Sequence, residues 1–256
     1  MKETKAQVLE VRDIAEGIFL MRVYSSALAD AAMPGQFLHI RVPGDHSHVL
    51  RRPISIMHID QESGTLSMAI QVKGEGTQRL RAARFGDKLD VLGPLGCGFD
   101  AGDAKTIYFI GGGVGVAPVR CAMDAFATKE SRAFFGYRTK NHVYALENLP
   151  CEADIVTDDG SMGEKALVTA PLLRAIAQKR PDLMMACGPG PMLRAIQKIA
   201  LEQQIPCQIS LEEHMGCGIG ACLGCTCKIK IKDGEAYKRV CMDGPVFTAE
   251  EVCFFD

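Results

Sequence analysis

The densest group of chemically reactive residues is a run of cysteines toward the C-terminal end. Cys217, Cys222 and Cys225 form the pattern C-x4-C-x2-C, and Cys241 follows after fifteen intervening residues. Four thiolates with this spacing are the ligands of plant-type [2Fe–2S] clusters. Glycines interspersed among the cysteines allow the backbone to approach bridging sulfides and to adopt positive φ angles. The segment therefore predicts an iron–sulfur centre held by these four side chains.

Two other interpretations of the cysteines stay open at this point. The first is a structural zinc site, although zinc usually takes two separate C-x2-C or C-x4-C pairs. The second concerns the fourth ligand, because Cys227 lies two residues after Cys225 and on the same side of an extended chain. We expect Cys241 to be the ligand and Cys227 to pack, since Cys241 completes the four-cysteine pattern.

A second group of residues, in the N-terminal half, predicts a phosphate site for a flavin dinucleotide. Arg52 precedes Pro53 and Ser55 in the run R-R-P-I-S. An arginine can bind a pyrophosphate through two hydrogen bonds, and a serine hydroxyl can hydrogen-bond a flavin or its phosphate. Gly76 and Thr77 lie at the start of an expected helix, where free N–H groups bind anions. The two segments describe opposite walls of one phosphate site, although the glycine turn alone is also typical of an ordinary helix start.

Two glycine loops further along the chain predict a nicotinamide nucleotide site. One strand runs into G-G-G-V-G-V-A-P, and another runs into C-G-P-G-P-M. Pro118 stands where the G-x-G-x-x-G fingerprint requires glycine, which argues against the usual Rossmann pyrophosphate site. Ligands of open α/β sheets bind beyond the carboxyl ends of the strands, so both loops should face one crevice. The expected contacts are Gly111, Gly112, Gly113, Gly115 and Gly188, with Asp158 at the end of a third strand near the adenosine.

The elements that must position these residues begin with a β-rich part at residues 1–100. Short runs with alternating or β-branched residues, separated by Gly, Pro or Asp, suggest an antiparallel barrel or sandwich. The expected strands span residues 6–11, 18–24, 36–42, 54–59, 66–72 and 87–92, and one helix is expected at residues 77–84.

Residues 101–211 alternate strands and helices, which is typical of a parallel sheet covered by helices. The expected strands span residues 106–110, 132–137, 153–157, 183–187 and 206–211, and the expected helices span residues 117–128, 169–179 and 191–203. Residues 212–256 lose this regularity and contain the cysteine pattern, with a hairpin expected at residues 226–231 and 237–240. The chain is therefore expected to fold as a β domain, an α/β domain and a small cysteine-rich module, with boundaries near residues 100 and 211.

Composition excludes several classes of function. With 47% hydrophobic and 23% charged residues over 256 positions, the chain has the composition of an ordinary globular protein. A net charge of −2 offers no basic surface for nucleic acid. The uncharged stretch at residues 106–119 is too short for a membrane helix, which needs about 20 residues. The charged N-terminus and the odd count of 11 cysteines argue against a signal peptide and a disulfide framework, so we expect a cytoplasmic protein.

The order of these motifs resembles the ferredoxin–NADP reductase superfamily, whose members combine a flavin barrel with an α/β nucleotide domain. The segments E-E-H-M-G-C-G-I-G-A-C-L-G-C, at residues 212–225, and V-C-M-D-G-P-V-F, at residues 240–247, narrow the resemblance to the electron-transfer subunits of type B dihydroorotate dehydrogenases. This resemblance implies FAD and a [2Fe–2S] cluster, and a heterotetramer with an FMN-containing catalytic subunit. Dihydroorotate would be oxidised at that FMN during pyrimidine synthesis, and electrons would pass through the cluster and FAD to NAD⁺ as hydride.

The resemblance also assigns roles to individual residues. It places Arg52, Pro53, Ile54 and Ser55 at the FAD, together with Ile70, Gln71, Val72, Gly76 and Thr77. It makes Cys217, Cys222, Cys225 and Cys241 the cluster ligands and brings Cys187 near the nicotinamide. From its own surroundings in the sequence, Cys187 also remains open to interpretation as a buried thiol.

Two rival functions remain compatible with these residues. The same cofactors occur with other partners in ferredoxin:NAD(P) oxidoreductase and sulfide dehydrogenase subunits, and the present motifs separate these poorly from the first interpretation. The other rival function is that of a zinc-stabilised nucleotide-binding adaptor without redox chemistry. A visible spectrum distinguishes the last, because zinc is colourless whereas flavin and cluster absorb.

Overall fold

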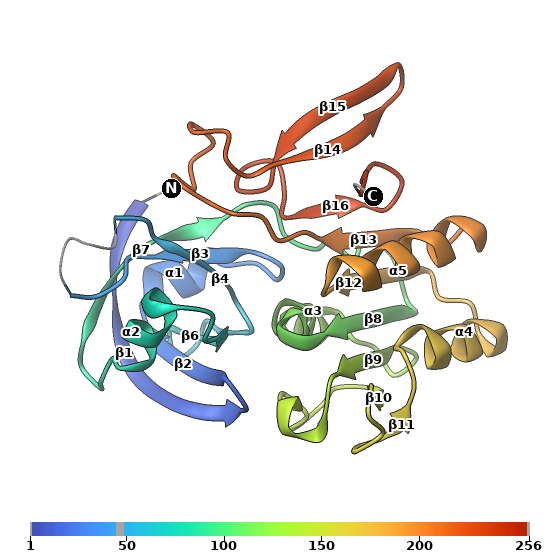
Figure 1. Cartoon of the computed structure of the whole chain (residues 1–256), viewed down its shortest axis with the longest axis horizontal. Coiled ribbons are helices and arrows are strands. Elements are labelled where there is room, and N and C mark those ends of the chain that lie inside the picture. Colours follow the sequence, from blue (N-terminus) through green and yellow to red (C-terminus); the bar gives the residue numbers. More distant parts are fainter. Residues whose placement is uncertain (1, 45–48, 255–256) are drawn as a thin grey trace.

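The computed structural model describes residues 2–44 and 49–254. Within these residues the strands form two seven-stranded sheets and one two-stranded sheet. The first sheet forms the barrel on one side of the molecule, the second forms the α/β part on the other, and the C-terminal hairpin lies above their junction (Figure 1).

The barrel contains the first seven strands of the chain. They are β1 (Lys2–Ala15), β2 (Ile18–Tyr24), β3 (Phe37–Ile40), β4 (Arg52–Ser55), β5 (His58–Asp60), β6 (Thr65–Gln71) and β7 (Lys88–Leu95), in the order β4-β3-β7-β1-β2-β6-β5. All pairs in this sheet are antiparallel. The predicted barrel or sandwich is therefore an antiparallel barrel, filled by aliphatic side chains from alternate strand positions.

The prediction of one strand over residues 54–59 is wrong, because the chain changes partner within it. The Ile56 N–H donates to Gln36 O beside β3 at 3.1 Å, and the next N–H, of Met57, donates to Ser67 O on β6 at 2.8 Å. β4 and β5 thus lie at opposite edges of the sheet, and the bend between them closes the barrel. A periodicity of two cannot distinguish one long strand from two short ones joined by such a bend.

Two helices accompany the barrel. α1 (Ser26–Ala31) was not expected from the sequence, because its six residues are too few to display a helical period. It contributes Leu28 and Ala29 to the barrel core. α2 (Glu75–Arg81) begins two residues earlier than expected, directly after the Gly74 turn.

The second sheet has a parallel centre, as predicted. Its strands are β8 (Ile107–Gly112), β9 (Arg132–Tyr137), β10 (Glu152–Thr157), β11 (Glu164–Lys165), β12 (Leu183–Cys187), β13 (Cys207–Ser210) and β16 (Val246–Thr248), in the order β11-β10-β9-β8-β12-β13-β16. The connecting helices are η1 (Gly113–Gly115), α3 (Val116–Phe126), η2 (Lys140–His142), α4 (Thr169–Gln178) and α5 (Gly190–Glu202). The order reverses between β8 and β12, which is where ligands bind in open α/β sheets.

Alternate residues of the central strand face different helices. Ile107 and Phe109 of β8 pack in the cluster that contains α3, whereas Tyr108 and Ile110 pack with residues of α4 and α5. Both faces of the sheet are therefore buried, which explains the continuous apolar run in this strand. None of the helices formed by residues 2–44 and 49–254 has the length and hydropathy of a membrane span.

The tail is tied to both larger parts. The hairpin is formed by β14 (Thr226–Ile231) and β15 (Gly234–Arg239), and it projects from the top of the molecule in Figure 1. β16, which was not expected, then pairs antiparallel with β13 at the edge of the second sheet. Residues Phe37 and Leu95 of the barrel share a core with Cys225, Cys227 and Cys241 of the tail. The cysteine segment therefore packs directly on β3 and β7.

Candidate functional site

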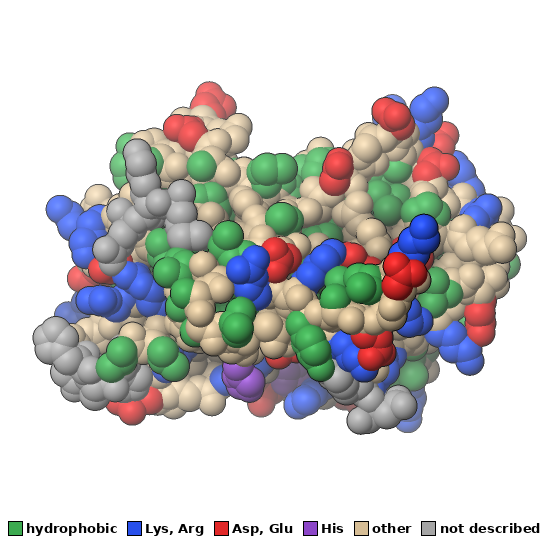
Figure 2. Space-filling view, turned by 90° about the horizontal axis from the view of Figure 1, so that it is seen from above, with side chains coloured by type: hydrophobic (Ala, Val, Ile, Leu, Met, Phe, Trp, Pro, Cys, Tyr) green, Lys and Arg blue, Asp and Glu red, His purple; other side chains and the backbone are tan. Residues whose placement is uncertain are grey.

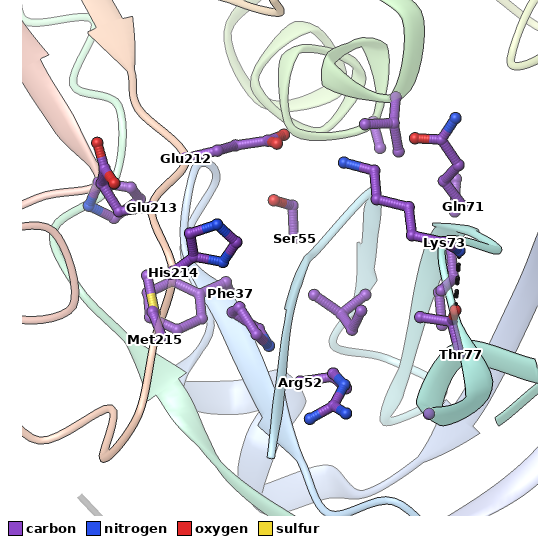
Figure 3. Close-up of a pocket in the computed structure, with 18 of the residues that line it drawn as sticks. Phe37, Arg52, Ser55, Gln71, Lys73, Thr77, Glu212, Glu213, His214 and Met215 are labelled. Carbon is purple, nitrogen blue, oxygen red and sulfur yellow. Dashed lines mark hydrogen bonds between the residues drawn. The ribbon is translucent and has the colours of Figure 1, made fainter. Parts of the chain in front are cut away.

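A cleft of about 640 Å³ opens where the barrel, the second sheet and the tail meet (Figure 3). Strands β3, β4 and β6 and the turn before α2 supply one side, and residues near η1 and after β13 supply the others. The lining residues are Phe37, Arg52, Pro53, Ile54, Ser55, Ala69, Ile70, Gln71, Lys73, Gly74, Glu75, Gly76, Thr77, Val114, Ala117, Ser210, Leu211, Glu212, Glu213, His214, Met215 and Pro245. A concave site of this size with both apolar and polar walls suits a cofactor.

Most residues expected at FAD are brought together here. Those that line the cleft are Arg52, Pro53, Ile54, Ser55, Ile70, Gln71, Gly76 and Thr77. Val72 instead packs against the barrel core, because alternation along the strand turns it away from its neighbour Gln71.

Several cleft residues were not expected from the sequence. Figure 3 shows Lys73 and Glu212 extending into the cleft, with His214 and Met215 beside Phe37. A single lysine in a turn carries no motif, and residues 212–215 belong to a segment whose pattern is dominated by cysteine and glycine. Their place in the cleft follows from the tail crossing over the barrel.

Arg52 is held in place by its own chain. Its Nη1 donates to Leu50 O at 2.7 Å, and the guanidinium lies against Gly76. A methyl group added at Gly76 would lie 2.7 Å from Arg52 Nε, so the glycine is needed for the guanidinium to take this place. The sequence pattern of an arginine opposite a glycine turn therefore corresponds to a direct contact across the cleft.

The turn before α2 is organised by Thr77. Its hydroxyl accepts from the N–H groups of Lys73 and Gly74 at 3.0 and 3.2 Å, and it donates to Gly74 O at 2.9 Å. The dashed line in Figure 3 marks one of these bonds. The threonine thus fixes the backbone that faces Arg52, which is a role in addition to any contact with a cofactor.

The expected nicotinamide glycines are largely explained by close packing. A methyl group at Gly112 would lie 2.5 Å from Met192 Sδ, and one at Gly188 would lie 2.3 Å from Met192 Cε. A methyl group at Gly115 would lie 2.6 Å from the backbone of Cys187. The two glycine loops therefore touch each other, as their place at the carboxyl ends of β8 and β12 requires.

The remaining residues of this set differ in their surroundings. A methyl group at Gly111 would lie 2.9 Å from Val116, so this glycine also serves packing. Gly113 has open space around it and a φ of +54°. Asp158 is exposed beyond the end of β10 and does not line the cleft.

Buried tyrosines hold the loop after β8. Tyr144 Oη lies 3.0 Å from Val114 O and 3.3 Å from Gly113 O. Tyr137 Oη donates to Tyr144 O at 2.8 Å. Burial, followed by the neighbouring Tyr137, raises the pKa of Tyr144, which keeps its hydroxyl protonated and able to donate. The pair fixes the backbone of the loop against the second sheet.

Cys187 is fully buried at the end of β12. Its burial, together with the charge of Glu212, raises the pKa of the Cys187 thiol, and a hydrogen bond with Ser210 opposes that shift only in part. The side chain is therefore a neutral thiol rather than a thiolate. It can pack or donate weakly near the cleft, but it is not an activated nucleophile.

The first two predicted cluster ligands lie close together in the loop after β13. The N–H groups of Ile219 and Cys222 both donate to Cys217 Sγ at 3.4 Å. Burial raises the pKa of the Cys217 thiol, but these backbone hydrogen bonds and the neighbouring Cys222 together outweigh it and lower the pKa to about 6. The loop therefore favours a thiolate at this position, which is the form that binds metal.

The other two predicted ligands form a second, deeper pair. Burial and the adjacent Cys225 thiol raise the pKa of Cys241 to about 12, and Cys217 adds to the shift. Cys227 packs in the same core but lines a separate cavity of about 290 Å³ with Cys253. Cys241 is the thiol within hydrogen-bond reach of Cys225.

This donor set fits a two-iron cluster. The thiols are arranged as a Cys217–Cys222 pair and a Cys225–Cys241 pair. A [2Fe–2S] cluster has four thiolate ligands distributed over two irons.

Three protein-family models match successive parts of the chain. Residues 7–98 match the oxidoreductase FAD-binding domain, and residues 109–198 match the oxidoreductase NAD-binding domain. Residues 212–253 match the iron–sulfur cluster binding domain of dihydroorotate dehydrogenase B. FAD, NAD and an iron–sulfur cluster are therefore the cofactors of this fold.

Curated relatives match over nearly the full length. The electron transfer subunit of dihydroorotate dehydrogenase B (NAD(+)) from Caldanaerobacter subterraneus subsp. tengcongensis is 41% identical over 252 residues, covering 98% of each chain. That from Bacillus pumilus is 38% identical over 260 residues, again covering 98% of each. The chain belongs to this family. Dihydroorotate dehydrogenase B electron transfer subunits are oxidoreductase subunits, so the prediction of redox function is confirmed and the zinc adaptor is excluded.

Solved structures agree with this assignment. A chain of the NADH-dependent reduced ferredoxin-NADP oxidoreductase superposes on this electron transfer subunit with a TM-score of 0.82 and 28% identity, covering 97% of this chain and 89% of that one. The ferredoxin reductase of carbazole 1,9a-dioxygenase, at 19% identity, has a TM-score of 0.68 and covers 80% of this chain and 66% of that one. The similarity to this second structure shows only that the fold is shared.

Proposed function

We propose that this electron transfer subunit takes electrons from the FMN of a dihydroorotate dehydrogenase catalytic subunit and delivers them to NAD⁺, in pyrimidine synthesis. The cluster handles single electrons and FAD converts them to hydride, which NAD⁺ requires. One observation supports direct transfer between the two groups. Phe37 lines the cleft and also packs in one core with Cys225 and Cys241, so the two cofactor sites share a wall.

Different residues of the chain would hold the two cofactors of this electron path. Arg52 and the turn at Gly76 and Thr77 would hold the FAD phosphates, and Ser55 would contact the flavin. Cys217, Cys222, Cys225 and Cys241 would hold the cluster, and the backbone N–H groups at Cys217 Sγ would favour its negative charge. The described side chains keep water out of the wall between the sites, because Phe37, Cys225 and Cys241 are buried.

NAD⁺ would receive the hydride at the other side of the cleft. Val114 and Ala117, in and after the loop held by Tyr144, line the same cleft as the flavin motif. A nicotinamide nucleotide bound at the carboxyl ends of β8 and β12 would therefore reach the flavin. Cys187 would lie at that end as a neutral thiol, with Gly188 and Asp158 along the rest of the nucleotide.

The partner would cover the outer side of the cysteine loop. Ile219 and Leu223 are exposed at 48% and 60%, although both are large apolar residues on the loop that carries the ligands. Figure 2 shows this upper side of the molecule, where hydrophobic side chains are interspersed with charged ones. A catalytic subunit docked here would place its FMN near the cluster, and two copies of each subunit would form the heterotetramer. We place this complex in the cytoplasm, because a reducing compartment keeps cysteine ligands from being oxidised to disulfides.

Anaerobic purification of the tagged chain from its native cell tests the proposal. We expect an FMN-containing chain to co-purify and the eluate to reduce NAD⁺ when dihydroorotate is added. An eluate with FAD and cluster but with no response to dihydroorotate would contradict the proposal.

A second candidate is supported by one observation, the 0.82 TM-score with the NADH-dependent ferredoxin-NADP oxidoreductase chain. On that alternative the same cofactors would exchange electrons with ferredoxin or another redox partner, such as that of a sulfide dehydrogenase. The same eluate distinguishes the two, because it would then reduce NAD⁺ with reduced ferredoxin or sulfide and not with dihydroorotate. The 41% identity to dihydroorotate dehydrogenase B subunits, against 28% here, favours the first candidate.

A further inference from the structure

His39 is a fully buried histidine that no step of the proposed function uses. It lies in β3 with 0% of its surface exposed. Within the described part of the chain, neither ring nitrogen has a hydrogen-bond partner of ordinary geometry. The Arg51 backbone approaches the ring and opposes the lowering of its pKa, but it falls short of such a bond. A buried imidazole without a hydrogen-bond partner lowers the stability of the folded protein. A partner is therefore expected in the protein with its cofactors bound.

The register of the sheet places this ring on the face of β3 that the tail covers. His39 is paired with Pro53 of the flavin motif, and the next residue, Ile40, is paired with Arg52. Because side chains alternate along a strand, His39 lies on the same face of β3 as Phe37, which lines the cleft and packs with the cysteines. The histidine therefore faces the tail and not the interior of the barrel.

The cluster loop closes directly over the ring. A methyl group added at Gly218 would lie 2.4 Å from His39 Nδ1, and Gly218 has a φ of +71°. This glycine is the residue after Cys217, the first predicted ligand. The position of Gly218 thus requires glycine both for its backbone angle and because Nδ1 occupies the space of a side chain.

The ring is neutral under ordinary conditions. Burial and the nearby Arg51 and Arg52 charges lower the pKa of His39 to about 4. A neutral imidazole has one N–H donor and one acceptor nitrogen. The groups that a bound cluster brings to this loop are sulfur atoms, which accept hydrogen bonds, and such bonds tune the reduction potential of iron–sulfur clusters.

We propose that His39 is a positioning residue of the cluster and donates a ring N–H hydrogen bond to a sulfur of the loaded cluster. In this way a residue of the flavin barrel would set the reduction potential of the cluster. This inference rests on the proposed cluster ligands. The side chain that stabilises the cluster would then come from the same strand ladder that carries the flavin motif.

The test is an EPR-monitored redox titration of the purified complex. His39→Leu removes the donor, His39→Asn can place an amide N–H close to the position of Nδ1, and His142→Leu removes a histidine from η2 as a control. Donation to sulfur favours the more negative, reduced cluster. We therefore expect His39→Leu to shift the equilibrium about tenfold toward the oxidised cluster, which is about 59 mV for a one-electron centre. His39→Asn and His142→Leu should stay close to the wild-type potential.

A loaded His39→Leu cluster with the wild-type potential would overturn the inference. If His39→Leu does not retain the cluster, His39→Asn is compared with His39→Gln, whose amide reaches the position of Nε2. The inference is supported if the cluster of His39→Asn keeps the wild-type potential while that of His39→Gln has a lower one. It is rejected if the two variants have the same potential. A wild-type complex without a [2Fe–2S] signal would instead contradict the proposed function.

Discussion

At the scale of single residues, Arg52 is positioned before any ligand binds. Its bond to Leu50 O and its contact with Gly76 restrict the guanidinium to the cleft wall. A side chain fixed in this way loses little conformational entropy when it binds a phosphate. The affinity for FAD should therefore depend strongly on this one residue.

Arg52→Ala should weaken FAD binding. A hydrogen bond to a charged group contributes roughly 1.5–3 kcal/mol, so we expect the Kd for FAD to rise about 10- to 150-fold. Flavin fluorescence in a titration of the reconstituted chain measures the change. Arg22→Ala, in a surface pair with Glu10 on the barrel, is the matched control and should bind FAD as the wild type does. An unchanged Kd for Arg52→Ala would reject the residue as a phosphate anchor.

Some residue-scale expectations could be made from the sequence and others could not. The side chains of Arg52 and Thr77 carry recognisable chemistry, and both line the cleft. Glycine has no side chain, so a sequence cannot say whether Gly112 or Gly115 makes room for a ligand or for Met192 and Cys187. His39 carries no motif, and its place beneath the cluster loop depends on contacts between distant segments.

At the scale of elements, the loop after β8 is held by a single side chain from another segment. Tyr144 reaches it from the segment after η2 and holds two successive carbonyls. The tyrosine is itself anchored by Tyr137 at the end of β9. The loop is thus fixed by the neighbouring strand and not by its own glycines.

Tyr144→Phe should impair nicotinamide binding and spare FAD. A neutral hydrogen bond contributes about 1 kcal/mol, so we expect the KM for NADH to rise about fivefold with FAD content unchanged. NADH oxidation with an artificial electron acceptor measures the effect. Tyr237→Phe, on the exposed hairpin, should behave as wild type. An equal KM in the Tyr144 and Tyr237 variants would show that the loop does not depend on this hydroxyl.

The elements that the sequence could predict are those with a clear local period. The three longer helices and the parallel strands other than the two-residue β11 have clear apolar patterns, and they are found near the expected residues. β16 has only three residues and exists because β13 offers it an edge. The division between β4 and β5 results from barrel closure, which is a property of the whole sheet.

At the scale of the whole molecule, a polar contact joins the barrel to the second sheet. His58 Nδ1 in β5 lies 2.8 Å from Asp124 Oδ2 in α3, and Arg120 also pairs with Asp124 at 2.8 Å. The hydrogen bond with Asp124 raises the pKa of His58, whereas burial and Arg120 oppose the shift and Asp60 assists it. The junction between the two parts therefore contains an imidazole whose pKa is raised by its partner across the interface.

His58→Gln should reduce stability at low pH more than at high pH. Because the folded pKa is raised above 6.5, the contribution of protonated His58 is complete below that value and is lost as the pH rises through the folded pKa. His58 is 52% exposed, so we expect the difference in unfolding free energy to be about 0.2–1 kcal/mol. Thermal unfolding at about pH 5.5 and about pH 8.5 measures it, with His142→Gln as control. A loss that is the same at both pH values would contradict the account.

The cleft is the feature that the sequence could not provide. Its walls come from segments more than 150 positions apart, such as Arg52 and Glu212, and each segment taken alone has an ordinary explanation. The cofactors could be predicted because their ligands are grouped along the chain. The wall shared by the two sites, at Phe37, became visible only from the packing of the tail on the barrel.

The most direct measurement compares wild-type and Cys222→Ser chains, each combined with the catalytic subunit, in dihydroorotate-dependent NAD⁺ reduction. Cys222 is exposed in the cluster loop and lies outside the flavin cleft. We expect Cys222→Ser to lose the cluster absorption and NAD⁺ reduction by dihydroorotate. Its FAD content and its oxidation of NADH with ferricyanide should be retained, because these need only the flavin end. Full NAD⁺ reduction by the Cys222→Ser complex would contradict electron entry through the cluster.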